Sequence, residues 1–156
     1  MKIIIYCYGK PNETYISEGV QLFTKRIQYY YPIEWQILAT PKNANTLSIQ
    51  DYKRKESESI LPKIEKDDYI ICLDENGKML SSPGLGKLLI KATNQSPKRL
   101  LFVIGGAYGI DTLVLQKANF VWSLSELVFP HQLVRLLLAE QIYRACSINN
   151  NEKYHH

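Results

Sequence analysis

The chain has 156 residues, of which 46% are hydrophobic and 22% are charged. These values are ordinary for one globular domain with a full core, and they exclude disordered and fibrous proteins. The formal net charge is +4, from 19 Lys and Arg against 15 Asp and Glu. This balance permits an anionic partner such as RNA without requiring one.

The cysteines and the apolar runs indicate a cytoplasmic protein. Cys7, Cys72 and Cys146 are odd in number and far apart, with no C-x-x-C and no metal-ligand spacing. We therefore expect a reducing compartment, no disulfide and no bound metal. The first residues lack the apolar core and cleavage site of a signal peptide. No apolar run approaches the ~20 residues that span a bilayer, so we expect no membrane segment.

The first half of the chain alternates strand and helix patterns. An apolar run at 2–8 predicts a buried strand, and Asn12 can cap the helix that follows. A second strand is predicted over 34–39 and a polar helix over about 49–61, with Ser48 as its cap. The first helix has an apolar stripe at spacings of four and three, namely Ile16, Val20, Phe23, Ile27 and Tyr30.

The second half continues the same alternation. A strand over 69–73 is predicted to stop at the turn sequence 74–77, and Ser82 caps a helix with Pro83 at its first position. The buried stripe of that helix is predicted to be Leu85, Leu88, Leu89 and Ala92. Further elements are predicted as a strand over 99–104, a short helix near 113–115, a strand over 120–124 and a helix within 130–148.

This alternation predicts an α/β fold, in which helices flank a mainly parallel sheet of about five strands in one domain. Ligands of such folds bind outside the carboxyl ends of the strands. Three turns lie at such ends: after Leu73, at Gly105-Gly106, and after Leu124. If their strands are neighbours, all three turns face one crevice, which we predict to be the pocket of a nucleotide-like cofactor.

The details of these turns leave alternatives open. The pattern Gly105-Gly106-x-x-Gly109 is not the dinucleotide fingerprint, and a plain tight turn explains it equally well. Ser123, Ser125 and the backbone of 124–129 offer polar groups beside apolar walls, as an adenine ring requires.

The last helix is apolar around its whole circumference between Leu133 and Tyr143. Because a sheet covers one side of a terminal helix, we expect a second copy of the chain to cover another side, in a two-fold homodimer. Glu140 and Arg144 are four residues apart and can pair. Arg135 has no such local partner, which makes it a candidate for contacting a phosphate or a base.

The chain contains the run SLSELVFPHQLVRLLLAEQIYRACSI, the turn FVIGGAYG, the segment LDENGK and a terminal YHH. Together these segments closely resemble the RlmH family, which belongs to the SPOUT class of methyltransferases. The resemblance spans the whole chain, in order and at the family's length. Two positions depart from common family patterns: Tyr108 stands where some members have an acidic residue, and Asn76 where Arg is common.

The resemblance implies an α/β fold whose C-terminal part, about residues 102–156, forms a trefoil knot that binds S-adenosylmethionine. It implies a homodimer that methylates N3 of a pseudouridine in the 23S RNA of the large ribosomal subunit, on the assembled ribosome. The cofactor-binding residues that it implies lie in the three turns already identified: Leu73, Gly105, Leu124, Ser125, Glu126, Leu127, Val128 and Phe129.

Methyl transfer to N3 requires a group that removes or compensates the ring proton. We expect His155 to act as the base near neutral pH and Tyr154 to stack on the target. Arg144 or Arg135 is expected to stabilise the anionic ring or to hold a phosphate. In a two-fold dimer, the tail of one subunit can complete the pocket of the other.

Basic side chains outside the site are candidate phosphate contacts, namely Lys10, Lys25, Arg26, Lys53, Arg54 and Lys55. For the cluster at 53–55, a solvated helix face is the favoured interpretation. Two other functions stay open: a SPOUT enzyme that acts on another RNA such as tRNA, and a nonenzymatic dimeric module that binds a nucleotide.

Overall fold

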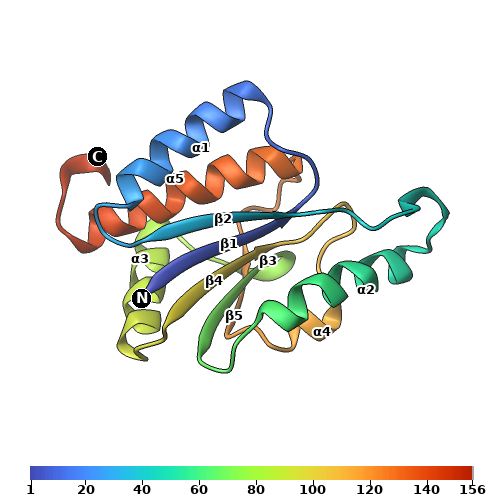
Figure 1. Cartoon of the computed structure of the whole chain (residues 1–156). Helices are drawn as coiled ribbons and strands as arrows, with labels where there is room; N and C mark the ends of the chain where they lie inside the picture. Colours follow the sequence, from blue (N-terminus) through green and yellow to red (C-terminus); the bar gives the residue numbers. More distant parts are fainter. Residues whose placement is uncertain (156) are drawn as a thin grey trace.

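A five-stranded parallel sheet forms the centre of the computed structural model, which describes the chain from Met1 to His155, without the side chain of His155 (Figure 1). The strand order is β2-β1-β4-β3-β5, and every pairing is parallel. The α/β fold with a parallel sheet that the sequence predicts is therefore confirmed. The strands are β1 Lys2–Tyr8, β2 Ile33–Leu38, β3 Asp68–Met79, β4 Arg99–Ile104 and β5 Phe120–Ser123.

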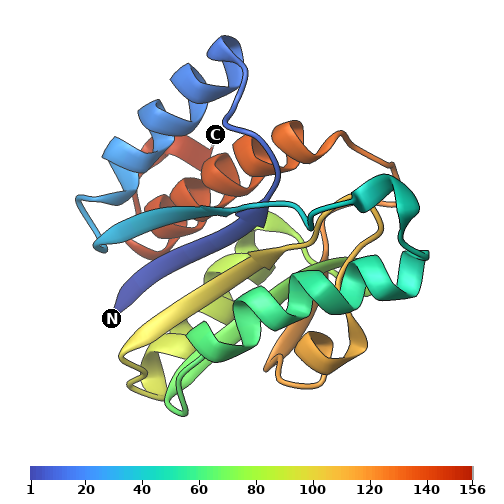
Figure 2. The same ribbon diagram turned by 45° about the vertical axis from the view of Figure 1, so that its right-hand side comes forward.

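Helices cover both faces of this sheet, because successive strand residues point to opposite sides and both sides are apolar. Helices α1, α3 and α5 pack on the face to which Ile3 and Ile5 point, whereas α2 and α4 pack on the face of Ile4 and Tyr6 (Figure 2). The helices are α1 Thr14–Ile27, α2 Ile49–Ile60, α3 Ser82–Asn94, α4 Thr112–Leu115 and α5 His131–Asn149. Short 3-10 turns are η1 Ala44–Thr46, η2 Leu61–Lys63 and η3 Lys153–His155.

Two of the predicted helix caps are wrong. Glu13, not Asn12, stands at the start of α1, and the Asn12 side chain instead accepts a hydrogen bond from Arg135. Ser81, one residue before the predicted Ser82, caps α3 by accepting from the backbone N–H of Gly84. The Ser48 cap of α2 is confirmed, because its hydroxyl accepts from the N–H of Asp51.

The predicted turn after Leu73 is also wrong in part, because β3 continues to Met79. The pairing of β3 with β5 shifts register between Leu73 and Lys78, so the polar residues form an irregularity within the strand instead of ending it. Gly77 makes this possible: a Cβ there would lie 2.7 Å from the backbone carbon of Trp122. Only glycine allows the two strands to approach this closely.

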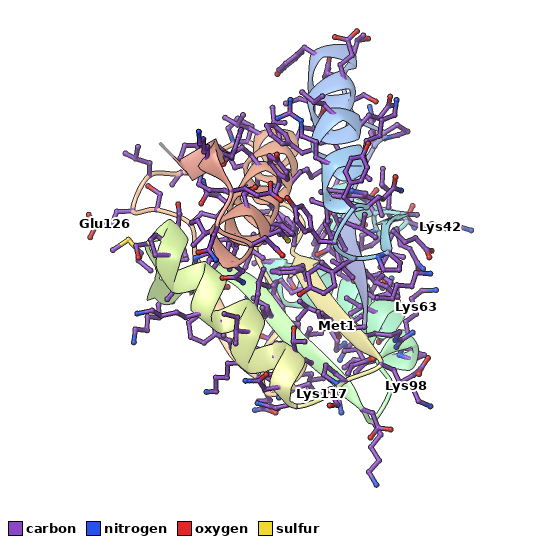
Figure 3. The ribbon with its side chains drawn as sticks, turned by 90° about the vertical axis from the view of Figure 1, so that its left-hand side faces the viewer. Met1, Lys42, Lys63, Lys98, Lys117 and Glu126 are labelled. Carbon is purple, nitrogen blue, oxygen red and sulfur yellow. The ribbon has the colours of Figure 1, made fainter. Side chains whose placement is uncertain are left out.

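Helix α5 lies between α1 and α3 on one face of the sheet, as the side view of Figure 3 shows. We expected the chain itself to cover only one side of α5, and this expectation is wrong. Leu138, Ala139, Ile142 and Ala145 are fully buried by these neighbours. The trefoil knot and the assignment of residues 1–156 to one domain stay predictions.

Candidate functional site

A cavity of about 670 Å³ opens at the carboxyl ends of β3, β4 and β5. It is lined by the start of the β3 irregularity, by the glycine turn after β4 and by the segment that joins β5 to α5. Each residue for which the resemblance implies cofactor contact lines it: Leu73, Gly105, Leu124, Ser125, Glu126, Leu127, Val128 and Phe129. The three turns thus meet in one crevice.

Strand register explains why the turns meet. Leu73 of β3 pairs with Ile104 at the end of β4 and with Trp122 near the end of β5. The irregularity of β3 that follows Leu73 therefore lies level with the ends of β4 and β5, and these three backbone segments border the same space. Glu126 lies on the rim at this end of the sheet, whereas Lys98 and Lys117 precede β4 and β5 at the opposite end (Figure 3).

The glycine turn has no room for side chains. A Cβ at Gly105 would lie 2.7 Å from the backbone carbon of Gly109, because the turn closes on itself through a bridge between Gly106 and Gly109. Gly109 has a φ of +84°, which is a left-handed conformation that glycine adopts without strain. A bare backbone therefore forms this wall, and a ligand can approach it closely.

The remaining walls combine apolar and polar groups. Leu73, Ile104 and Trp122 form the buried apolar part. The β5–α5 segment is shaped by the hydroxyl of Ser125, which accepts from the N–H of Leu127 at 3.0 Å. Cavity size and lining fall within the range of sites for small organic ligands, so the residues fit a nucleoside-sized cofactor.

Two apolar side chains of this segment point into solvent. Leu127 is 71% exposed and Val128 is 88% exposed. Apolar side chains that stand together at the rim of a pocket are typical of a surface that another molecule covers.

Two residues of α2 belong to this region, although the sequence reasoning did not place them there. Lys53 lines the cavity, contrary to the favoured interpretation of a solvated face. Glu56 is buried directly beneath the glycine turn, and its Oε2 accepts from the N–H of Gly106 at 3.2 Å. The sequence contains a signal that Glu56 is buried. Tyr52, Glu56 and Ile60 follow one another at intervals of four residues, so the Glu56 carboxylate lies within the buried stripe of α2.

The surroundings of these groups affect their protonation. Burial raises the pKa of Glu56 to about 7, and the hydrogen bonds from Gly106 and Tyr52 oppose this shift. His131, also at the cavity, has its pKa lowered from 6.5 by burial and then by the charge of Arg135.

Two of the residues predicted to be catalytic, Arg144 and Tyr154, lie elsewhere, at the C-terminal end of α5. The Nη2 and Nε of Arg144 donate to Glu140 at 2.6 and 2.9 Å, which confirms the predicted pair. The hydroxyl of Tyr154 donates to the same carboxylate oxygen at 3.2 Å, and its ring lies 4.9 Å from the guanidinium of Arg144. Arg26 of α1 also faces the Tyr154 ring, at 5.9 Å. We call Glu140, Arg144, Tyr154 and Arg26 the C-terminal cluster.

Burial and the charge of Glu140 raise the pKa of Tyr154, so its phenol stays protonated at neutral pH. The side chain of His155 lies outside the described part of the structure.

The C-terminal cluster is remote from the cavity of its own chain. Val134, the last residue of α5 that lines the cavity, and Arg144 are ten helical positions apart. At about 1.5 Å per residue, this corresponds to roughly 15 Å along the helix axis. Within one chain, the structure therefore does not bring Arg144 and Tyr154 together with the predicted cofactor-binding residues.

Arg135 has a different environment from the one expected. It is 2% exposed, and its guanidinium donates to the carbonyls of Tyr8 and Lys10 and to the side chain of Asn12. Arg135 has no local acceptor among these contacts, as the sequence indicates, but it finds acceptors far along the sequence and is not left free for a ligand. It fixes the segment after β1 against α5, and these contacts lend no support to its predicted role toward RNA.

Comparisons with known proteins place this arrangement in a family. The family model described as "Predicted SPOUT methyltransferase" matches residues 1–155. The chain is 41% identical to the ribosomal RNA large subunit methyltransferase H of Parabacteroides distasonis, over 100% of this chain and 99% of the relative. It is 40% identical to the protein of that name from Cytophaga hutchinsonii, over 100% of both, and 42% identical to that from Bacillus pumilus, over 99% of both.

Among the described residues, no group of three or more His, Cys, Asp or Glu is arranged to hold a metal ion. None of the helices in this part of the chain has the length and apolar character needed to cross a membrane.

Proposed function

Since the chain belongs to the SPOUT methyltransferase family, we propose that it uses S-adenosylmethionine to methylate N3 of a pseudouridine in 23S ribosomal RNA. The cavity at the carboxyl ends of β3, β4 and β5 is the observation that supports this proposal most directly. It combines a bare glycine backbone, apolar walls and polar main-chain groups, as a nucleoside with a charged tail requires.

The cofactor, when bound, supplies an electrophilic methyl group on a sulfonium. The chain's part is to hold it and to exclude water. Leu73, Gly105 and the segment from Leu124 to Phe129 would surround its adenine and ribose. The carboxylates of Asp74, Glu75 and Glu126 at the same cavity make the site favourable for a cationic ligand.

The second requirement is a proton acceptor for the target base, because N3 of a uracil-type ring is a weak acid. We assign this role to His155, with Tyr154 stacking on the target and Arg144 stabilising the anionic ring. Glu140 holds Arg144 and Tyr154 in one arrangement through a shared oxygen. Arg135 stays the second candidate for ring stabilisation.

The separation of roughly 15 Å along α5 between Val134 at the cavity and Arg144 supports a homodimer. In a two-fold dimer, the cluster of one subunit would approach the cavity of its partner and complete it. The exposed Leu127 and Val128 at the rim would then be covered by cofactor and partner. We propose the dimer on this ground, since the argument from the circumference of α5 no longer holds.

The proposed substrate is the large-subunit RNA within the assembled ribosome, in the cytoplasm. The net charge of +4 is modest, so both subunits and the shape of the ribosomal site would contribute to recognition. Of the candidate phosphate contacts, Arg26 lies within the C-terminal cluster, and Lys53 lines the cavity.

One experiment tests the whole proposal. Purified protein is incubated with labelled S-adenosylmethionine and with intact ribosomes, separated subunits or tRNA, and the methylated nucleoside is identified by mass spectrometry. We expect N3-methylpseudouridine to form in 23S RNA only when intact ribosomes are the substrate. Label in tRNA would indicate another substrate, and cofactor binding without transfer to any RNA would indicate a nonenzymatic module.

A further inference from the structure

Glu56 is a buried carboxylate that holds the glycine turn from behind. Its Oε2 accepts from the backbone N–H of Gly106 at 3.2 Å, across the interface between α2 and the end of β4. A Cβ added at Gly106 would overlap Glu56 Oε1, so the carboxylate occupies the space that a side chain at this position would need. The turn and the carboxylate are therefore fitted to each other.

The backbone around Glu56 is itself fixed. Its carbonyl accepts from the hydroxyl of Tyr8 at 2.5 Å and from the hydroxyl of Ser59 at 2.7 Å. Glu56 is 4% exposed, so its position depends on packing and not on solvent. A displacement of the carboxylate would thus be passed directly to Gly106.

Few charges compensate this carboxylate. The titratable groups around it are Tyr8 from β1, Tyr52 and Lys53 from α2, and Asp111 before α4. Tyr108 packs edge-on against Tyr52, with ring centroids 5.1 Å apart. Among the described residues, no ion pair to Glu56 is found, and its Oε1 has no hydrogen-bond partner.

We propose that Glu56 is a positioning residue for the methyl donor: its ionised carboxylate holds Gly105 and Gly106 in the shape that the cofactor requires. The inference rests on the proposed function, because it concerns the same cavity. A charged acceptor bonds the Gly106 N–H more strongly than a neutral one. The buried negative charge behind the turn also favours a ligand that carries a sulfonium cation.

This role links cofactor binding to a proton. Because burial brings the pKa of Glu56 to about 7, the side chain is partly protonated at neutral pH in the free protein. A ligand that prefers the ionised form lowers this pKa, and the protein then releases a proton on binding. If only the ionised form binds, affinity for S-adenosylmethionine rises about tenfold between pH 6 and pH 8.

Calorimetry with S-adenosylmethionine at pH 6, 7 and 8, in buffers of different ionisation enthalpy, tests this inference. We expect the wild type to release a fraction of a proton at pH 7 and to show the tenfold rise in affinity. Glu56→Gln keeps an oxygen acceptor for Gly106 but cannot ionise. The affinity of this variant for S-adenosylmethionine is expected to vary less than about twofold between pH 6 and pH 8. It should lack the proton release at pH 7 that the wild type shows. Circular dichroism verifies that the variant is folded.

The two proposals fail in different ways. If the wild type does not bind S-adenosylmethionine at any pH, the proposed function falls, together with this inference. If the wild type binds and Glu56→Gln shows the same pH profile and the same proton release, only the role of Glu56 is refuted.

A double-mutant cycle gives a second measurement that does not depend on pH. Gly106→Ala inserts a methyl group toward the Glu56 carboxylate and should weaken binding of S-adenosylmethionine by about tenfold or more. In the Glu56→Ala background the same substitution has space and should cost much less. Equal losses in both backgrounds would show that Glu56 does not position the turn.

Discussion

The cavity and the C-terminal cluster are built in different ways. The cavity walls come from three neighbouring strands and the turns that leave them, so a single chain forms it completely. The C-terminal cluster lies at the far end of α5, where Glu140 joins Arg144 and Tyr154 at the protein surface. One region is a cavity with all its lining in a single chain, whereas the other is a group of polar and aromatic side chains joined by Glu140. This division predicts that binding and chemistry can be separated by mutation.

The largest effect is expected from removing the tail. Deleting Tyr154 to His156 should lower the rate of methyl transfer to ribosomes by about a thousandfold, since general-base and stacking contributions are lost together. The affinity for S-adenosylmethionine should change less than about threefold, because the described residues that line the cavity are all retained. Single-turnover rates and calorimetry measure the two quantities. Full activity of the truncated protein would refute the role of the tail.

The next effect concerns stability near the cavity. The pKa of Glu56 is raised in the folded protein from 4.5 to about 7, so the native state binds more protons than the unfolded state between these values. The contribution of the Glu56 carboxyl to the free energy of unfolding is therefore fully present below pH 4.5. It is lost as the pH rises through 7.

For this reason Glu56→Gln should gain stability relative to the wild type between pH 5 and pH 8, by about 2.5 kcal/mol. Urea unfolding of both proteins at several pH values measures this difference. Parallel pH curves for the two proteins would mean that the carboxyl titrates normally. The C-terminal cluster should not influence this pH dependence of stability. The tail-deleted protein, with and without Glu56→Gln, should therefore show the same difference.

A smaller effect, on cofactor affinity, is expected at the glycine turn. Gly105→Ala places a Cβ 2.7 Å from the backbone of Gly109, and it should weaken S-adenosylmethionine binding by at least about tenfold. The tail of this variant remains intact. It can therefore be mixed with the tail-deleted protein, whose cavity is intact, to ask which subunit supplies each part.

After random subunit exchange, half of the dimers in the mixture are heterodimers. If the cluster acts on the partner's cavity, each heterodimer contains one complete site. Activity should then recover to about a quarter of the wild-type value after subunit exchange. No recovery above the sum of the two separate variants would indicate that each chain completes its own site, or that the active protein is monomeric.

The sequence predicts the cavity far better than it predicts the cluster's relation to it. Apolar runs identified each strand, and the parallel register then brought Leu73 of β3 level with the ends of β4 and β5. Local patterns failed where a distant contact competes with them: Asn12 is drawn to Arg135 instead of capping α1, and Gly77 lets β3 continue along β5. Glu56 was missed because an isolated helix gives no sign of which turn will cover it.

The smallest effect is expected from neutralising the centre of the C-terminal cluster. Glu140 and Arg144 are 19% and 26% exposed and four residues apart on α5. Such pairs contribute about 0.5 kcal/mol, so Glu140→Gln should change the free energy of unfolding by no more than this amount. The same substitution replaces the charged oxygen that Arg144 and Tyr154 share by a neutral amide oxygen, which holds them less strongly, so methyl transfer should fall more than stability does. Denaturant unfolding together with the ribosome assay makes the comparison. A stability loss of several kcal/mol at unchanged activity would make the cluster a structural element of α5 and would leave the cavity without its proposed counterpart.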